Sequence, residues 1–259
     1  MERNSIGDNP PSEPLQKTCK NCGAYNATQN NYCNSCGKPL KSNLIEPNDE
    51  EIKSVVNQII VFFVANVIII GLLSSGWIDV NLSVSIFFDL IFAGTIVAFA
   101  IPNWAHIQKQ YAAIRIKPLK ILVLTLSMVA FAWLVHIVSG AMNRSLFDAD
   151  GDSIGVFWQS DYPLAMAILF VGVFPAVFEE LGFRGFLFNH LLRFTNPRTV
   201  IITTGILFSF IHFSFLSLGW YIPLGIFLGY LRFRYRTLWY CMLCHFVYNT
   251  TLVCIEYFD

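Results

Sequence analysis

The sequence predicts an all-α polytopic membrane protein, with seven or eight transmembrane helices behind a small cysteine-rich N-terminal module. Of its 259 residues, 55% are hydrophobic and only 13% are charged, against about 25% charged in typical soluble domains. A soluble domain of this length could not bury so much apolar surface, so the bilayer is the expected solvent. The net charge of zero gives no electrostatic support for binding nucleic acid, and we expect no such partner.

The chain divides into a polar head and an apolar body. Residues 1–16 contain three prolines among polar side chains and are expected to form a disordered tail. Residues 17–41 hold four cysteines, residues 42–54 form a polar linker, and residues 55–259 form the transmembrane domain. Because residues 1–44 contain no apolar stretch that could serve as a signal peptide, we expect a cytosolic N-terminus.

The cysteines of the head form two Cys-x2-Cys pairs, each followed by glycine: Cys19, Cys22, Cys33 and Cys36. Four thiolates suit Zn²⁺ in a closed structural site, and the metal would supply most of the folding energy of so short a unit. A disulfide framework is the alternative, but a cytosolic position disfavours it. A redox Cys-x-x-Cys is expected beside a βαβ pattern, which the sequence lacks.

This module resembles the short zinc ribbons found at the ends of many bacterial membrane proteins, so a bacterial cell membrane is the expected location. Its Zn²⁺ is predicted to be structural, because four thiolates leave no open coordination position for catalysis. The expected role of the zinc ribbon is to dock a protein partner or to restrain the rest of the protein.

Seven apolar segments follow the linker, at residues 55–73, 84–100, 119–139, 164–192, 200–218, 221–231 and 238–255. A bilayer core is crossed by about 20 apolar residues, so the fourth segment is too long and the sixth too short. Residues 164–192 are expected to form either one tilted helix kinked at Pro175 or two helices broken near Gly182. These alternatives give seven or eight spans.

Basic residues indicate the orientation, since cytosolic loops of membrane proteins are rich in Lys and Arg. Three connections carry them: Lys109, Arg115, Lys117 and Lys120; then Arg193 and Arg198; then Arg232, Arg234 and Arg236. All three fall on the cytosolic side if the N-terminus is cytosolic and residues 164–192 cross once. The C-terminus would then lie outside.

Ionisable side chains inside apolar spans are costly, and each is by default a hypothesis about function. The fourth segment holds Glu179, Glu180 and Arg184, the fifth holds His212, and the last holds His245. Counted at 1.5 Å per residue, the carboxylates and His212 lie about 18 to 20 Å into their segments and His245 about 10 Å. These groups are therefore expected to converge in one pocket.

Helix geometry predicts some of the pairings. Glu180 and Arg184 lie four residues apart, so they share one helix face and can pair. Glu179 lies about 100° around the helix and is free for another task. His245 and Asn249 are also four residues apart, and both can donate a hydrogen bond to a single target.

Three motifs occur in order on the late segments: Glu-Glu-x-x-x-Arg at Glu179, Glu180 and Arg184, Phe-x-x-x-His at Phe208 and His212, and His-x-x-x-Asn at His245 and Asn249. In this order and setting they resemble the motifs of the CAAX protease and bacteriocin-processing family. No motif position departs from the pattern. The resemblance covers roughly residues 160–255, and the first three apolar segments and the cysteine module lie outside it.

The resemblance implies an intramembrane endopeptidase that cleaves a membrane-associated or hydrophobic peptide. By analogy, Glu179 is the general base that activates water, together with His212. His245 and Asn249 polarise the scissile carbonyl and hold the developing oxyanion. The Glu-Arg pair of the fourth segment braces the site.

A catalytic metal is left open by the sequence. Glu179, His212 and His245 could supply a three-ligand zinc site. However, the sequence has no His-Glu-x-x-His helix, and the donor pair of the last segment favours a metal-free mechanism.

Two other functions are alternatives to the protease. A charged cluster in a helical bundle could be an ion relay of a transporter, but we find no internal repeat. The same fold could also serve a non-catalytic membrane protein for binding, immunity or scaffolding. The expected partners are membrane lipids, the peptide or protein substrate, and a protein bound by the zinc ribbon.

Overall fold

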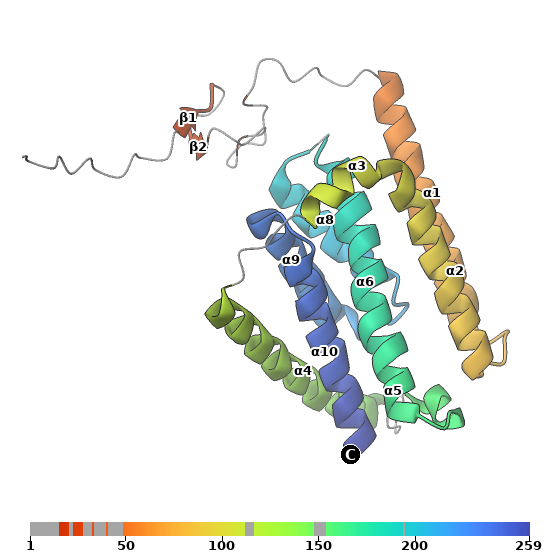
Figure 1. Cartoon of the computed structure of the whole chain (residues 1–259). Coiled ribbons are helices and arrows are strands. Elements are labelled where there is room, and N and C mark those ends of the chain that lie inside the picture. The colour runs from red at the N-terminus through yellow and green to blue at the C-terminus, as the bar shows by residue number, and fades with distance from the viewer. Residues whose placement is uncertain are drawn as a thin grey trace, which may run out of the picture.

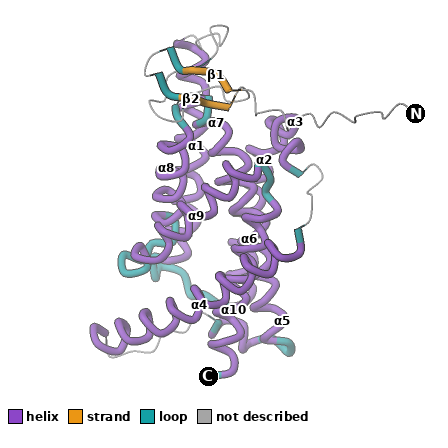
Figure 2. The backbone as a smooth tube through the Cα atoms, turned by 90° about the vertical axis from the view of Figure 1, so that its left-hand side faces the viewer, coloured by secondary structure: helices purple, strands orange, loops and turns teal. Residues whose placement is uncertain are grey.

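The computed structural model describes residues 16–20, 23–27, 33, 40, 49–111, 117–147, 154–193 and 195–259. In the described part of the head, β1 (Gln16–Thr18) pairs antiparallel with β2 (Tyr25–Ala27), with Lys17 opposite Asn26. Everything else of regular structure that is described is helical, as Figure 2 shows. The expected all-α body is therefore confirmed.

The cysteine module is described only in part. Cys19 and Cys33 are buried, and the Asn26 amide donates to the Cys33 sulfur at 3.5 Å. Cys22 and Cys36 lie outside the described residues. The zinc ribbon therefore stays a prediction.

The helical elements of the body, in chain order, are α1 (Asp49–Ser74), α2 (Leu82–Ala100), η1 (Ile101–Asn103), α3 (Trp104–Ile107), η2 (Gln108–Gln110), α4 (Pro118–Phe147), η3 (Gly155–Gln159), α5 (Pro163–Ala167), η4 (Ile168–Val173), α6 (Phe174–Glu180), η5 (Leu181–Leu187), α7 (Phe188–Leu191), α8 (Pro197–Phe210), α9 (Leu218–Tyr235) and α10 (Trp239–Phe258). In Figure 1, α1 and α2 run side by side along one edge, α6 and α10 lie in the middle, and α4 crosses behind α10. Helix α1 begins at Asp49, inside the expected linker.

Four helical stretches among the described residues are long and apolar enough to cross a bilayer: Ile52–Ser74, Leu82–Gln110, Pro118–Leu146 and Pro163–Leu191. The protein is a multi-pass membrane protein. Helix α8 is apolar but shorter, and α9 and α10, which carry polar side chains such as Arg232 and His245, are not in this set. The total of seven or eight spans stays a prediction.

The fourth apolar segment forms one continuous helical run rather than two helices. It alternates α-helix with two π-helical stretches, η4 and η5, and Gly182 lies within η5 without a break. Pro175 is the second residue of α6, which follows η4 directly. Since proline has no N–H and crowds the preceding turn, a wider π turn accommodates it without ending the helix.

The core of the body is built around η5, which is buried at all seven positions. Phe183 and Phe186 pack on Phe62 of α1, and Phe183 also meets Phe208 of α8 edge to face. A helix that is covered on every side must be apolar on every side, except where a polar group has a partner. Arg184, in the middle of η5, is the exception.

The outer helices expose large apolar side chains. Val61, Phe87 and Leu126, on α1, α2 and α4, are all more than half exposed. Water would penalise such faces, whereas lipid would not, so these helices present a surface suited to the bilayer.

Helices α8 and α9 are packed backbone against backbone. A Cβ placed on Gly205 would lie 2.7 Å from the Ile226 nitrogen, and one on Gly225 would lie 2.8 Å from the Gly205 Cα. Small residues permit this approach, as is common between membrane helices. The contact brings the Gly225 carbonyl within reach of the centre of the bundle.

The ends of α8 and α9 differ from the expected segments. Helix α8 ends at Phe210, well short of residue 218, and Phe213 in the following turn has φ 47°. Helix α9 continues to Tyr235, so Arg232 and Arg234 lie within a helix rather than in a loop. Hydropathy predicted both boundaries wrongly, because the turn after α8 is apolar although it is not helical, and the last turns of α9 carry basic side chains although they are helical.

Candidate active site

The predicted pair of Glu180, at the end of α6, and Arg184, in η5, is present. Arg184 Nη1 lies 2.8 Å from Glu180 Oε1, and both side chains are fully buried. Arg184 Nη2 donates to the Gly225 carbonyl at 2.9 Å, and its guanidinium lies 4.5 Å from the centre of the Phe208 ring. A buried arginine depends on such partners, and the close α8–α9 contact supplies one of them, the Gly225 carbonyl.

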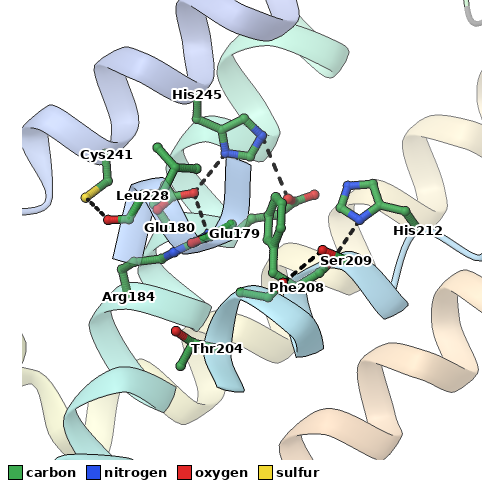
Figure 3. Close-up of polar contacts among 12 residues, drawn as sticks. Glu179, Glu180, Arg184, Thr204, Phe208, Ser209, His212, Leu228, Cys241 and His245 are labelled. Atoms are coloured by element: carbon green, nitrogen blue, oxygen red, sulfur yellow. Dashed lines mark hydrogen bonds and ion pairs between the residues drawn. The ribbon is translucent and has the colours of Figure 1, made fainter. Parts of the chain in front are cut away.

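His245 joins this pair from α10, as Figure 3 shows. Its Nδ1 lies 2.9 Å from Glu180 Oε1, the same oxygen that accepts from Arg184. Because a carboxylate accepts, the imidazole donates from Nδ1, which leaves Nε2 for other partners. Nε2 lies 3.9 Å from Glu179 Oε2, too far for a direct hydrogen bond.

Glu179 lies beside the other nitrogen of the His245 ring and takes no part in the Glu180–Arg184 pair. Its Oε2 is buried and has no hydrogen-bond partner among the described residues. A buried carboxylate oxygen without a donor is costly, and such groups in native proteins require an explanation. A water or a substrate group held between Glu179 and His245 would satisfy it.

His212 lies in the turn after α8. Its Nδ1 donates to the Phe208 carbonyl at 2.9 Å, so the neutral ring has its acceptor at Nε2. With Glu179 it lines a cavity of about 240 Å³. The structure thus brings together four predicted residues of the first and third motifs, namely Glu179, Glu180, Arg184 and His245. His212 lies next to them, in the lining of the cavity that it shares with Glu179.

Phe208, the aromatic residue of the second motif, packs among three of these side chains. Its buried ring lies 5.6 Å from that of His245 and 4.9 Å from that of His212, between ring centres. The Arg184 guanidinium lies over the face of the same ring, where a cation is attracted to the aromatic π-system.

Asn249 has a partner that the sequence did not predict. Its Nδ2 donates to the Val171 carbonyl at 2.8 Å. Val171 lies four residues before Pro175, which has no N–H to give to that carbonyl. Asn249 therefore supplies a missing hydrogen bond of the fourth helix, and one amide hydrogen is left for other targets.

Residues 161–251 match the family model of Type II CAAX prenyl endopeptidase Rce1-like proteins. The matched stretch includes all seven motif residues. It excludes α1, α2 and α4. No curated protein and no solved structure matches the chain.

Three residues of this centre were missed by the sequence analysis. Tyr221 of α9 stacks on the His212 ring at 4.0 Å. Arg232 donates from Nε to the Arg184 carbonyl at 3.1 Å and from Nη2 to Asn189 at 2.9 Å. Asp89 of α2 lines the same cavity as Glu179, although α2 lies outside the Rce1-like match.

Only Asp89 had a signal in the sequence. It is the single charged residue of α2, and the reasoning that singled out the glutamates applies to it equally. Arg232 was misread as a loop residue, and nothing local distinguishes Tyr221 from the other tyrosines.

For the catalytic metal that the sequence left open, the described residues contain no group of three or more His, Cys, Asp or Glu side chains arranged to hold an ion. The choice between a metal-free and a metal-assisted mechanism stays open.

Proposed function

We propose that this protein is an intramembrane endopeptidase that hydrolyses a peptide bond of a membrane-associated or hydrophobic peptide. The observation that carries the proposal is the unpartnered, buried Oε2 of Glu179, which faces His245 Nε2 across 3.9 Å. That gap suits a group with both a proton to give and an oxygen to be held, which describes a water attacking a carbonyl.

In the proposed reaction, Glu179 takes one proton from this water while the water oxygen attacks the carbonyl carbon. His212 Nε2 accepts a hydrogen bond from the remaining O–H. As the tetrahedral intermediate collapses, the C–N bond breaks and Glu179 returns its proton to the leaving amine. No group is consumed, so the enzyme is ready for a second turnover.

The oxyanion of this intermediate would be held from α10. His245 protonated at both nitrogens donates to Glu180 from Nδ1 and to the oxyanion from Nε2. Glu180, fixed by Arg184, stabilises the positive imidazolium and sets its orientation. The second amide hydrogen of Asn249 is proposed to donate to the same oxygen.

The test uses purified full-length protein in lipid nanodiscs with a library of membrane peptides. Glu179→Ala should abolish cleavage, whereas Glu50→Ala, the same change at an exposed position of α1, should not. Cleavage that survives a chelator supports the metal-free mechanism. Loss that zinc restores would favour a bound metal, once zinc loss from the N-terminal module is controlled with a cysteine variant.

The outcome against this proposal is equally defined. If no peptide is cut and Glu179→Ala leaves the cellular phenotype intact, the proposal that the protein is an endopeptidase is wrong. The protein would then be a binding, immunity or scaffolding protein on the same fold.

We also propose that Cys19, Cys22, Cys33 and Cys36 hold a structural Zn²⁺ in a zinc ribbon on the cytosolic side of a bacterial cell membrane. The burial of Cys19 and Cys33 and the amide donated to the Cys33 sulfur support this assignment, since zinc thiolates commonly accept such bonds. The ribbon's proposed role is to bind a protein partner.

Elemental analysis of the full-length protein tests the zinc proposal. We expect about one zinc per chain. Replacing Cys19 and Cys22 by serine should remove it, because two thiolates cannot retain the ion. Cys254→Ser, on α10, should leave the zinc content unchanged. A wild-type protein without zinc would contradict the ribbon.

A further inference from the structure

Asp89 is a carboxylate in an otherwise uncharged helix, α2. It is the single charged residue of α2, whose other eighteen positions are apolar or small and uncharged. Its side chain is half-buried, and no hydrogen bond or ion pair joins it to another of the described residues. Carboxylates in apolar spans are expensive and are retained where they meet a partner.

The surroundings of Asp89 define what such a partner would be. Asp89, Glu179 and His212 line one cavity of about 240 Å³, whose remaining wall is aliphatic and aromatic. Leu73, Phe92 and Ile211 contribute to that wall. The cavity therefore combines an apolar surface with two carboxylates and has no cationic side chain in its lining.

A substrate side chain that suits both features is a long aliphatic stem with a positive end. Lysine and arginine bury their methylene groups against apolar surface and keep the charged head with a polar partner. An acidic side chain would meet like charge, and a purely apolar one would leave Asp89 without a partner.

On these observations we infer that Asp89 determines specificity: it binds a lysine or arginine side chain of the substrate next to the peptide bond that is hydrolysed. The inference rests on the proposed endopeptidase and names its substrate class, an apolar peptide with a basic residue near the cleavage site. Asp89 contacts substrate but takes no part in moving protons.

Paired peptides test this inference with the full-length protein in nanodiscs. Each pair is identical except for lysine or norleucine at one position around the cleaved bond, so that only the charge differs. At one position we expect kcat/KM for the lysine peptide to exceed that for norleucine by about tenfold or more.

Asp89→Asn should bring this ratio close to one and leave the norleucine rate within about threefold of wild type. Asp89→Glu should retain the preference, and Asp89→Lys should shift it to a glutamate peptide. Asp79→Asn, the same loss of charge at an exposed position before α2, should change nothing.

Three results would overturn the inference: no preference for lysine in the wild type, an Asp89→Asn variant that keeps the preference, or one that loses both rates equally. The last would make Asp89 a proton-transfer or structural residue. If Asp89→Asn fails to fold, the wild-type lysine-to-norleucine ratio and the Asp89→Glu variant decide. A wild type that cuts neither peptide contradicts the endopeptidase itself and is distinguishable from these outcomes.

Discussion

At the scale of single residues, Glu180 organises the centre although it performs no chemistry in the proposed mechanism. One of its oxygens accepts from both Arg184 and His245, and all three side chains are buried. A charge in such a place depends on every partner, because no water replaces a partner that is removed. Its contribution is to hold the imidazole and to balance the arginine.

Replacing Arg184 by alanine should therefore destabilise the protein strongly. The change leaves the Glu180 carboxylate buried without its cation, which costs about 3 kcal/mol or more. The thermal unfolding midpoint in detergent measures it. Arg198→Ala, at an exposed position of α8, is the matched control and should shift the midpoint little. Equal shifts for both variants would contradict the buried pair.

Asn249 has two candidate roles, and a double mutant separates them. Asn249→Ala removes the donor to the Val171 carbonyl and, in the proposed mechanism, a donor to the oxyanion. We expect kcat to fall about 10²-fold with KM nearly unchanged, as for other oxyanion donors.

Pro175→Ala supplies a backbone N–H four residues after Val171 and can replace the structural bond of Asn249. In the double variant, stability should recover while kcat stays low. Recovery of kcat as well would show that the only role of Asn249 is its hydrogen bond to the Val171 carbonyl, which Pro175 cannot make.

At the scale of elements, two features position the site: the π turns of the fourth helix and the contact between α8 and α9. The π stretch η5 places Arg184 at the centre of the bundle, where it can reach Gly225 of α9. Arg232 of α9 donates back to the Arg184 carbonyl. The two elements are therefore joined by hydrogen bonds in both directions, and displacement of α9 would disturb Glu180 through Arg184.

Gly205→Ala tests this coupling. The new methyl would lie 2.7 Å from the Ile226 nitrogen, so the helices must separate, at a cost of about 1–3 kcal/mol. Cleavage should fall as well, because the Gly225 carbonyl moves away from Arg184. Gly94→Ala on α2 meets nothing within 4 Å and should leave stability equal or slightly higher. Thermal unfolding and peptide cleavage measure both effects, and a neutral Gly205→Ala would contradict the contact.

At the scale of the whole molecule, the number of spans decides the side on which each end of the chain lies. Among the described residues, four helical stretches qualify by length and composition, and the fourth, Pro163–Leu191, is one continuous run. With α8, α9 and α10 as further crossings, seven spans place the termini on opposite sides, whereas eight place them on one side.

We predict seven spans with a cytosolic N-terminus. Epitope tags at the two ends, probed with protease on intact cells, should show the C-terminal tag removed and the N-terminal tag protected. Protection of both tags would indicate an even number of crossings, and removal of the N-terminal tag alone would invert the predicted orientation. Permeabilised cells, in which both tags are cut, provide the control.

Much of this architecture could be predicted because it depends on local spacing. The apolar segments follow from hydropathy, and the Glu180–Arg184 pair follows from the four-residue repeat of a helix. The predicted end of the fifth segment, at residue 218, was wrong because Phe213 and Phe215 make the turn after α8 apolar, although its backbone is not helical. Hydropathy measures the solvent of a segment and not its conformation.

The sequence by itself thus determined the membrane setting, which follows from the apolar segments. It also determined the Glu180–Arg184 pair and the rotation of Glu179 by about 100° from Glu180, since each is a property of one helix. Only the tertiary structure decided that His245 and Arg184 bond to the same Glu180 oxygen and that Asn249 donates to the Val171 carbonyl. It also decided that Asp89 lines the same cavity as Glu179. These contacts join different helices, and they depend on the depth and rotation of each helix in the bundle. Close packing around η5 and the glycine contact of α8 with α9 set those two quantities, and neither can be read from the spacing of residues along one segment.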